Sequence, residues 1–545
     1  MAQFTLSVAV AVAAALATVF IAKFAANRQH VRKLQAAKVA MQGLPRDTTT
    51  HVMVRKIANS LPDSGGNFYL NLWPFSKTLL VIANPVTAAQ VEAAFLDKPA
   101  SMCGTMEVIN GGPSLMTMHG DTWKKWRTLF NPGFAPAYMT GLAPSILDEV
   151  GVLCQLLRDH ATRGKGGSGG GVFQLEEYTL KFTFDVISRI TLGTRLHYQT
   201  QGSVLADGLR RLVYWTPYGT TFNPFRRWLS PRPLVQWYTS RCIDRYLCGE
   251  VDKRFEELAE SRRDNNTRDS KKKAQVRSII SLVMDQYLAE TSETEQLSKE
   301  TFKNLVLPQL RMFLYAGHDT TSSTLLYCFH LLYSHPDVLS KVRAEHDDVL
   351  GHDFSTAHLR QVIADDPALL NQIPYTLAAI KEVLRLFPPA GSLRAGRPGL
   401  VLTDGNGRQY PTENCHLWTL NLVMHHNEQI FVRADEFLPE RWLVGPDDPE
   451  GLHPAQRGSW RPFEYGLRAC IGQTLAQLEL KVALVMTVRL FDIVPAYDEW
   501  DAMHPRKAGN SVRSVDGNRA YQAEMGGGGA HPADGFPVRV TLRQV

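Results

Sequence analysis

The chain has 545 residues, of which 44% are hydrophobic and 21% are charged. This balance is typical of a globular protein with a sizeable core. The net charge of +6 is small for this length, so the composition gives no support to a nucleic-acid-binding function. Seven scattered cysteines form no CxxC or CxxCH pattern, which leaves zinc ribbons, thioredoxin-type redox sites and covalent haem attachment without support.

The N-terminal segment has the composition of a membrane anchor. Residues 1–22 carry no charged side chain, and several Lys and Arg residues follow directly. About 20 apolar residues in a helix span the hydrocarbon core of a bilayer, and the positive charge that follows places the remainder in the cytosol. We expect a transmembrane signal anchor at 1–25, a basic linker at 26–45 and a catalytic domain at 46–545. A cleaved secretory signal is the alternative.

Beyond the anchor, the pattern predicts one mostly helical domain with small β-sheets. The β-rich runs Asn67–Trp73 and Thr78–Ala83 flank a Pro-containing turn, which indicates a hairpin. Helical periodicity then dominates to about Leu386, and short β segments alternate with helices from Val401 onward. Segments rich in glycine or polar residues predict surface loops or a late turn: Gly164–Gly171, Arg262–Lys273 and Gly526–Gly529.

One cysteine stands where it can bind a metal. Cys470 ends a glycine-containing loop, and an apolar-periodic stretch without Pro or Gly, Gln473–Phe491, follows it. At a helix N-terminus the exposed N–H groups and the helix dipole favour a thiolate. Gly466 and Gly472 leave room for backbone to approach a flat ligand, and Arg468 supplies a nearby cation.

This loop resembles the haem-binding loop FxxGxRxCxG of the cytochromes P-450. The matched residues are Phe463, Gly466, Arg468, Cys470 and Gly472. The resemblance implies the cytochrome P-450 fold and a haem b whose axial iron ligand is Cys470. The alternative is a lone buried cysteine beside a glycine turn.

A second segment is similar to the distal helix of the same family. The predicted helix Leu305–Leu332 contains Ala316-Gly317-His318-Asp319-Thr320-Thr321. The small Ala316–Gly317 pair would let the helix pass over the haem, and Asp319 with Thr320 would hold a water chain for proton delivery. In the alternative, the Thr320 hydroxyl bonds back to the preceding turn and Asp319 is merely solvated.

Charged residues elsewhere also match the family. Glu382 and Arg385, three positions apart on one helix face, resemble the ExxR motif, and Arg441 follows in Phe437-Leu438-Pro439-Glu440-Arg441-Trp442. The resemblance implies that Glu382, Arg385 and Arg441 form a structural charge triad.

Further cations are candidates to bind the haem propionates. Trp123 and Arg127 resemble the family's WxxxR helix, and guanidinium pairs well with carboxylates. Arg394 or Arg397 is another candidate, and the spacing does not decide between them. His425 has either a structural or a propionate role.

The resemblance implies a monooxygenase that uses dioxygen and electrons from an NADPH-dependent cytochrome P-450 reductase. The product would be a hydroxylated, epoxidised or oxidatively rearranged small molecule. One rival is a thiolate-haem isomerase or dehydratase that acts on a peroxide without a reductase. The other is a haem sensor or carrier without catalysis.

The substrate and the cellular setting rest on the same resemblance. The substrate pocket is expected near five segments: Met102–Ile109, Tyr214–Phe222, Phe313–Thr320, Ala390–Leu393 and Gly526–Gly529. The chain is similar to microsomal fungal members of secondary metabolism, which implies a polyketide or terpenoid substrate and a single-pass anchor in the endoplasmic reticulum membrane. The expected partners are the reductase and membrane lipid, without nucleic acid. A basic reductase-binding face is predicted from five cations: Lys124, Lys125, Arg457, Arg461 and Arg468.

Overall fold

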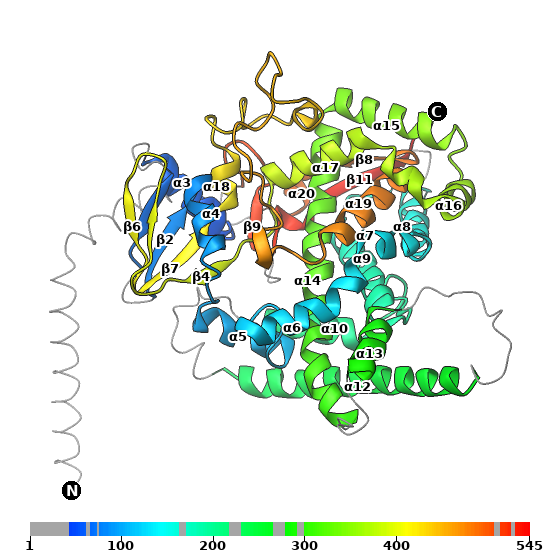
Figure 1. Cartoon of the computed structure of the whole chain (residues 1–545). Coiled ribbons are helices and arrows are strands. Elements are labelled where there is room, and N and C mark those ends of the chain that lie inside the picture. The colour runs from blue at the N-terminus through cyan, green and yellow to red at the C-terminus, as the bar shows by residue number, and fades with distance from the viewer. Residues whose placement is uncertain are drawn as a thin grey trace, which may run out of the picture.

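A long helix, α14 (Lys299–Ser334), runs through the middle of the molecule, with a helix-rich part on one side and a sheet-rich part on the other (Figure 1). The computed structural model describes residues 43–61, 66–72, 76–162, 170–216, 230–264, 278–290, 299–505, 513–524 and 529–544. Helices dominate these residues, as the apolar periodicity of the sequence predicts.

The remaining helices follow in chain order. They are α3 (Thr50–Asn59), α4 (Pro85–Ala93), α5 (Ala100–Asn110), α6 (Gly120–Phe130), α7 (Pro136–Gly141), α8 (Ala143–Thr162), α9 (Glu176–Leu192), α10 (Val204–Tyr214), α12 (Arg232–Asp264), α13 (Ile279–Glu290), α15 (Pro336–Leu350), α16 (Thr356–Asp365), α17 (Pro374–Leu386), α18 (Asn421–His425), α19 (Gln473–Val488) and α20 (Tyr497–Met503). Short 3₁₀ turns include η4 (Pro439–Trp442) and η5 (Gly466–Arg468).

The strands form small sheets. Their bounds are β1 (Asn67–Leu70), β2 (Thr78–Ile82), β3 (Phe173–Gln174), β4 (Leu393–Ala395), β5 (Val401–Thr403), β6 (Gln409–Pro411), β7 (Cys415–Thr419), β8 (Phe491–Pro495), β9 (Gln522–Glu524), β10 (Ala530–Pro532) and β11 (Pro537–Leu542). The largest sheet has the order β1-β2-β7-β4, with β2 and β7 parallel. The others are β3-β11-β8, β5-β6 and β9-β10.

The helical part holds the main hydrophobic core, to which α8, α9, α14 and α19 contribute. Within it, α14 packs closely on α9. A Cβ atom added to Gly317 would lie 2.7 Å from Cγ1 of Ile187 on α9. This contact gives the glycine a packing role that offsets its cost of about 1 kcal/mol inside a helix. Ala316 and Gly317 also line the large cavity described below.

The last part of the chain returns to the middle of the molecule. Strands β9 and β10 pair antiparallel and flank residues 525–528, which lie outside the described residues. The N–H of Ala530 donates to the carbonyl of Pro389 at 2.8 Å, and the Ser323 hydroxyl on α14 donates to the Ala530 carbonyl. The β9–β10 hairpin is thereby fixed against α14 through Ala530.

Several predictions from sequence are confirmed in local structure. β1 and β2 form the expected antiparallel pair, α14 covers the predicted Leu305–Leu332 helix, and α19 follows the Cys470 loop. The prediction of a polar loop at Arg262–Lys273 was wrong for the first residues of that range, because α12 continues to Asp264. The rest of that loop and most of Gly164–Gly171 lie outside the described residues.

The predicted anchor at 1–25 and nearly all of the linker at 26–45 also lie outside the described residues. Among the helices of the part that the structure does describe, none combines the length and apolarity required to cross a bilayer. All seven cysteines are described, and all are free thiols, as their unpaired spacing predicts.

Candidate functional site

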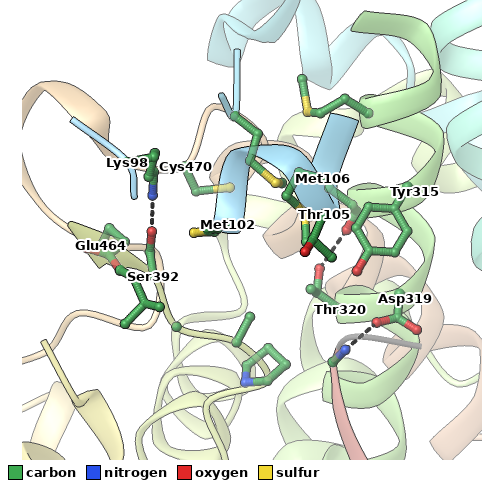
Figure 2. Close-up of a pocket in the computed structure, with 18 of the residues that line it drawn as sticks. Lys98, Met102, Thr105, Met106, Tyr315, Asp319, Thr320, Ser392, Glu464 and Cys470 are labelled. Carbon is green, nitrogen blue, oxygen red and sulfur yellow. Dashed lines mark hydrogen bonds between the residues drawn. The ribbon is translucent and has the colours of Figure 1, made fainter. Parts of the chain in front are cut away.

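A cavity of about 1680 Å³ lies between α14, the loop that precedes α19, helices α5 and α6, and strand β4. Figure 2 shows side chains from several of these elements around it. Its walls are largely apolar, and four methionines from three segments contribute to them: Met102 and Met106 on α5, Met116, and Met312 on α14. The described residues of all five segments that the sequence analysis assigned to the pocket contribute to the lining, with Tyr214–Phe222 represented by Tyr214, Trp215 and Thr216.

Cys470 alone among the seven cysteines lines this cavity, and its side chain is exposed there. It stands between η5 and the start of α19, and its N–H donates to the carbonyl of Phe463 at 2.8 Å. Phe463 lines the cavity too, and its ring packs edge-on against Trp460. Cys415, by contrast, is buried in β7 and does not line the cavity.

The environment of the Cys470 sulfur contains opposing influences. Desolvation by the surrounding protein raises the pKa of the Cys470 thiol, although the side chain is exposed to the cavity, while a hydrogen bond from the Gly472 backbone and the charge of Arg127 act against the rise. A metal ion bound at this position would favour the thiolate, because its charge stabilises a coordinating sulfur.

Four cations line one side of the cavity: Lys98, Arg127, Arg394 and Arg468. The Arg468 guanidinium lies 4.4 Å from the ring centroid of Trp123 and donates through Nη1 to the carbonyl of Met118 at 3.0 Å. Its Nε and Nη2 atoms are buried without a hydrogen-bond partner in the protein. Burial lowers the pKa of Arg468 to about 10, and neighbouring Arg394 adds to this effect.

The other cations are also incompletely neutralised. Burial, with Arg394 nearby, lowers the pKa of Lys98 to about 7, and its ammonium group donates to the Ser392 hydroxyl (Figure 2). Arg394 reaches Glu464 only at 3.8 Å. Arg127 donates to the carbonyl of Ala469 at 3.0 Å. This excess of positive charge on partly buried side chains fits an anionic ligand with carboxylates.

The structure separates the remaining propionate candidates. Arg394 lines the cavity and Arg397 does not. His425 is fully buried away from the cavity, where Nδ1 lies 3.0 Å from the carbonyl of Arg385 and Nε2 accepts from the Arg461 N–H at 3.1 Å. Of its two suggested roles, this position is compatible with the structural one.

Helix α14 places Asp319 and Thr320 at the opposite wall of the cavity (Figure 2). The Thr320 hydroxyl donates to the carbonyl of Ala316 at 2.9 Å, as the alternative interpretation predicts, and its lone pairs remain able to accept. Asp319 is buried rather than solvated. It accepts from the N–H of Gly529 at 2.8 Å and pairs with His531 at 3.1 Å.

Glu382, Arg385 and Arg441 meet in a fully buried cluster. Arg385 forms a two-pronged pair with Glu382 at 2.8 and 2.9 Å, and Arg441 Nε lies 2.9 Å from Oε1 of the same carboxylate. The cluster holds two positive charges and one carboxylate, and backbone carbonyls accept further hydrogen bonds from the guanidinium groups. Arg385, for example, donates to the carbonyls of His425 and Ala434. The cluster joins α17 to the segment that leads to the Cys470 loop.

The predicted basic face is smaller than the sequence suggests. Arg461 is buried and paired with Glu92, and Arg468 points into the cavity, so neither belongs to an outer surface. Lys124, Lys125 and Arg457 are exposed. Lys124 pairs with Asp121 on the same helix at 3.1 Å, which reduces its net effect.

Three residues of the site escaped the sequence analysis: Lys98, Glu176 and His531. Lys98 precedes α5 in no recognisable motif, and only the fold brings it to Arg394 and Arg468. His531 lies 212 positions from Asp319, a separation at which no local pattern signals a contact.

Comparisons with known proteins agree on one family. The family model described as Cytochrome P-450 matches residues 47–513. The chain is 34% identical to the cytochrome P-450 monooxygenase polC of Polytolypa hystricis, over 92% of this chain and 85% of that protein. It is 30% identical to the cytochrome P-450 monooxygenase acrF of Aspergillus aculeatus, over 88% of this chain and 95% of that protein.

Solved structures show the same fold. The crystal structure of a cytochrome P-450DA heme domain has a TM-score of 0.68 with 18% sequence identity, and the match covers 92% of this chain and 95% of that one.

Proposed function

Since the chain belongs to the cytochrome P-450 family of haem-thiolate monooxygenases, we propose that Cys470 is the axial ligand of its haem b. The observation that supports this most is the position of Cys470, the one cysteine exposed to the large cavity. The Gly472 N–H, directed at the sulfur, and the charge of Arg127 would stabilise the thiolate once iron is bound.

The cation cluster supports haem as the anionic ligand. Haem carries two propionates, and donors on one side of the cavity are supplied by Arg127, Arg394, Arg468 and Lys98, which are partly or fully buried. The unpartnered Nε and Nη2 atoms of Arg468 are the groups that a propionate would satisfy. Lys98, with its low pKa, would return to the charged form beside a carboxylate. The Arg468 guanidinium lies over the ring of Trp123, and this cation–π contact helps to hold it in place.

When bound, haem supplies the iron that activates dioxygen. The protein's part is to hold substrate and deliver protons. We assign proton delivery to Asp319 and Thr320, because both line the cavity on adjacent positions of α14. The Thr320 hydroxyl donates a hydrogen bond to the carbonyl of Ala316, so its oxygen can accept one from water in the cavity. Asp319 stores or supplies the proton that this water passes on.

We propose that the substrate is an apolar polyketide or terpenoid intermediate of secondary metabolism. The methionine-lined wall supports this assignment, because unbranched thioethers adapt to bulky and irregular hydrocarbon shapes. Phe313 and Val213 extend the apolar surface. We further propose that residues 1–25 anchor the enzyme in the endoplasmic reticulum membrane, through contact with membrane lipid, and that residues 26–45 link this anchor to a catalytic domain at 46–545.

The proposed reaction predicts a defined requirement for electrons. With an NADPH-dependent reductase, dioxygen and substrate, the enzyme is expected to consume NADPH and form oxygenated product. Thr320→Ala is expected to keep haem but to lower the yield of product per NADPH several-fold, because proton delivery is disturbed while the iron stays accessible. Thr320→Ser, which restores the hydroxyl, serves as the matched control. An unchanged yield in Thr320→Ala would mean that Thr320 has only a structural role, through its hydrogen bond to Ala316.

The exposed lysines of α6 are proposed to bind the acidic surface of the reductase. Lys124→Glu with Lys125→Glu is expected to slow reductase-driven turnover several-fold at low salt, and the difference is expected to shrink as salt rises. Replacement of both lysines by Gln should give a smaller effect in the same direction. Peroxide-driven turnover, which needs no reductase, is expected to stay nearly unchanged. Equal losses in both assays would instead indicate damage to the fold.

A further inference from the structure

Behind the α14 wall of the cavity, three ionisable side chains from three different elements meet. His531 on β10 lies between Asp319 on α14 and Glu176 at the start of α9. Its Nε2 atom is 3.1 Å from Oδ1 of Asp319, and its Nδ1 atom is 2.7 Å from Oε1 of Glu176. His531 is 1% exposed and each carboxylate less than 10%, so this cluster is shielded from bulk solvent.

A carboxylate within ion-pair distance of each ring nitrogen favours the charged imidazole. A neutral imidazole has one N–H, so it can donate to only one of the two carboxylates, whereas an imidazolium donates to both. Burial opposes the charged form, yet Asp319 and Glu176 outweigh burial and raise the pKa of His531 to about 10. Burial would raise the pKa of Asp319, but chiefly the charge of His531 lowers it.

Other titratable groups near the cluster add no competing charge. His318, adjacent on α14, is buried with its Nδ1 2.8 Å from the carbonyl of Leu314, and burial lowers its pKa. Tyr327 on α14 and Tyr497 on α20 lie close enough to feel the charge of Glu176, and chiefly burial raises the pKa of each phenol well above its usual value. The cluster therefore consists of one cation held by two carboxylates.

The β9–β10 hairpin also contacts Asp319 through the backbone of Gly529. The N–H of Gly529 donates to Oδ2 of Asp319, so one carboxylate oxygen is held by the backbone and the other by His531. A Cβ atom at Gly529 would lie 2.5 Å from Oδ2 of Asp319. Any larger residue there would displace the carboxylate that lines the cavity.

We propose that His531 is the positioning residue for Asp319, holding it as an aligned carboxylate at the cavity wall and replacing the proton that it delivers. This inference rests on the proposed role of Asp319 in proton delivery. The Nε2 proton of the His531 cation passes to the Asp319 carboxylate, and Asp319 releases this proton to the cavity and becomes a carboxylate again. The neutral imidazole keeps its Nδ1 proton on Glu176 until a solvent proton restores the cation.

The test begins with the charge state, which can be read without turnover. In His531→Gln the Gln amide is uncharged, so the buried Asp319 carboxylate loses its counter-ion and its pKa is expected to rise. An infrared band of a protonated carboxyl group is expected in this variant near neutral pH and not in the wild type. The band should weaken in His531→Gln/Asp319→Asn. Absence of the band in His531→Gln would overturn the proposal.

Thermal unfolding as a function of pH gives an independent reading. Because the pKa of His531 in the folded protein lies above its ordinary value of about 6.5, its stabilising contribution is complete below that pH. The contribution is lost as pH rises through about 10. The melting temperature of the wild type is therefore expected to exceed that of His531→Gln at pH 7, with a smaller difference at pH 10. A difference in melting temperature that does not change with pH would indicate that His531 stabilises the fold through packing alone.

The functional arm uses the yield of product per NADPH as a function of pH. The wild type is expected to give a flat profile from about pH 6 to about pH 8, because His531 stays charged, while His531→Gln gives a yield that changes at least twofold across this range. Gly529→Ala, which moves the carboxylate without removing a charge, is expected to lower the yield at every pH. Gly529→Ala also provides the functional test if His531→Gln does not fold. Identical profiles for all three proteins would refute the proposal.

Failure of this inference is distinguishable from failure of the proposed function. The reduced, CO-bound spectrum of the same samples reports thiolate ligation by Cys470, which His531→Gln should leave intact. Loss of the thiolate band in the wild type would refute the ligand assignment, while the infrared and unfolding measurements would still report on His531.

Discussion

Cys470→Ala is expected to yield a folded protein that lacks thiolate-ligated haem. The reason is geometric, because no other cysteine lines the cavity and the sulfur at this position has no substitute among its neighbours. The reduced, CO-bound absorption spectrum measures the effect, since its Soret band depends on a thiolate opposite the CO. We expect complete loss of that band.

Cys415→Ala is the matched control. Cys415 is buried in β7 and lies away from the cavity, so its replacement removes a small packing group but no ligand. The thiolate band should persist in this variant. A normal band in Cys470→Ala, or its loss in Cys415→Ala alone, would contradict the assignment of Cys470 as ligand.

Glu382→Ala is expected to cost roughly 3–5 kcal/mol of folding free energy, the range for a buried ion pair that loses one partner. Arg385 and Arg441, both fully buried, would be left with positive charges and no carboxylate between them. Trp442 would also lose the acceptor of its indole N–H, which lies 2.9 Å from Oε2 of Glu382. Since the whole net stability of a protein is about 5–15 kcal/mol, we expect a low yield of folded, haem-loaded protein.

Glu440→Ala provides the comparison. Glu440 also accepts from a cation and a ring hydroxyl, Lys341 and Tyr375, but its side chain is 33% exposed. Such a partly exposed pair contributes about 0–1 kcal/mol, so this variant should fold nearly normally. Urea unfolding of both variants measures the difference. A Glu382→Ala midpoint close to that of Glu440→Ala would remove the triad's structural role.

The elements that the sequence predicted well are those with a local signature. Apolar periodicity without Pro or Gly predicts α19, and the glycine-containing loop before it places Cys470 at the cavity. The pairing of Glu382 with Arg385 follows from their spacing of three on one helix. In each case the residues that interact are close in sequence or belong to one recognisable motif.

Residues that only the fold brings together were missed or misplaced. Arg461 and Arg468 were assigned to an outer basic face by charge alone, yet one is buried against Glu92 and the other points into the cavity. His531 was not considered, because its contacts come from α9 and α14, distant parts of the chain. Charge in a sequence does not reveal which way a side chain points.

The position of the β9–β10 hairpin has a consequence for biosynthesis. Gly529 and Ala530 line the cavity and bond to Asp319 and Ser323 on α14, so the wall that they complete is contributed by residues translated near the end of the chain. Helices α5, α6 and α9 leave the ribosome long before, and chains begin to fold from the N-terminal side during synthesis. This wall of the cavity can therefore be completed only after Gly529 and Ala530 have been synthesised, later than the loop that carries Cys470.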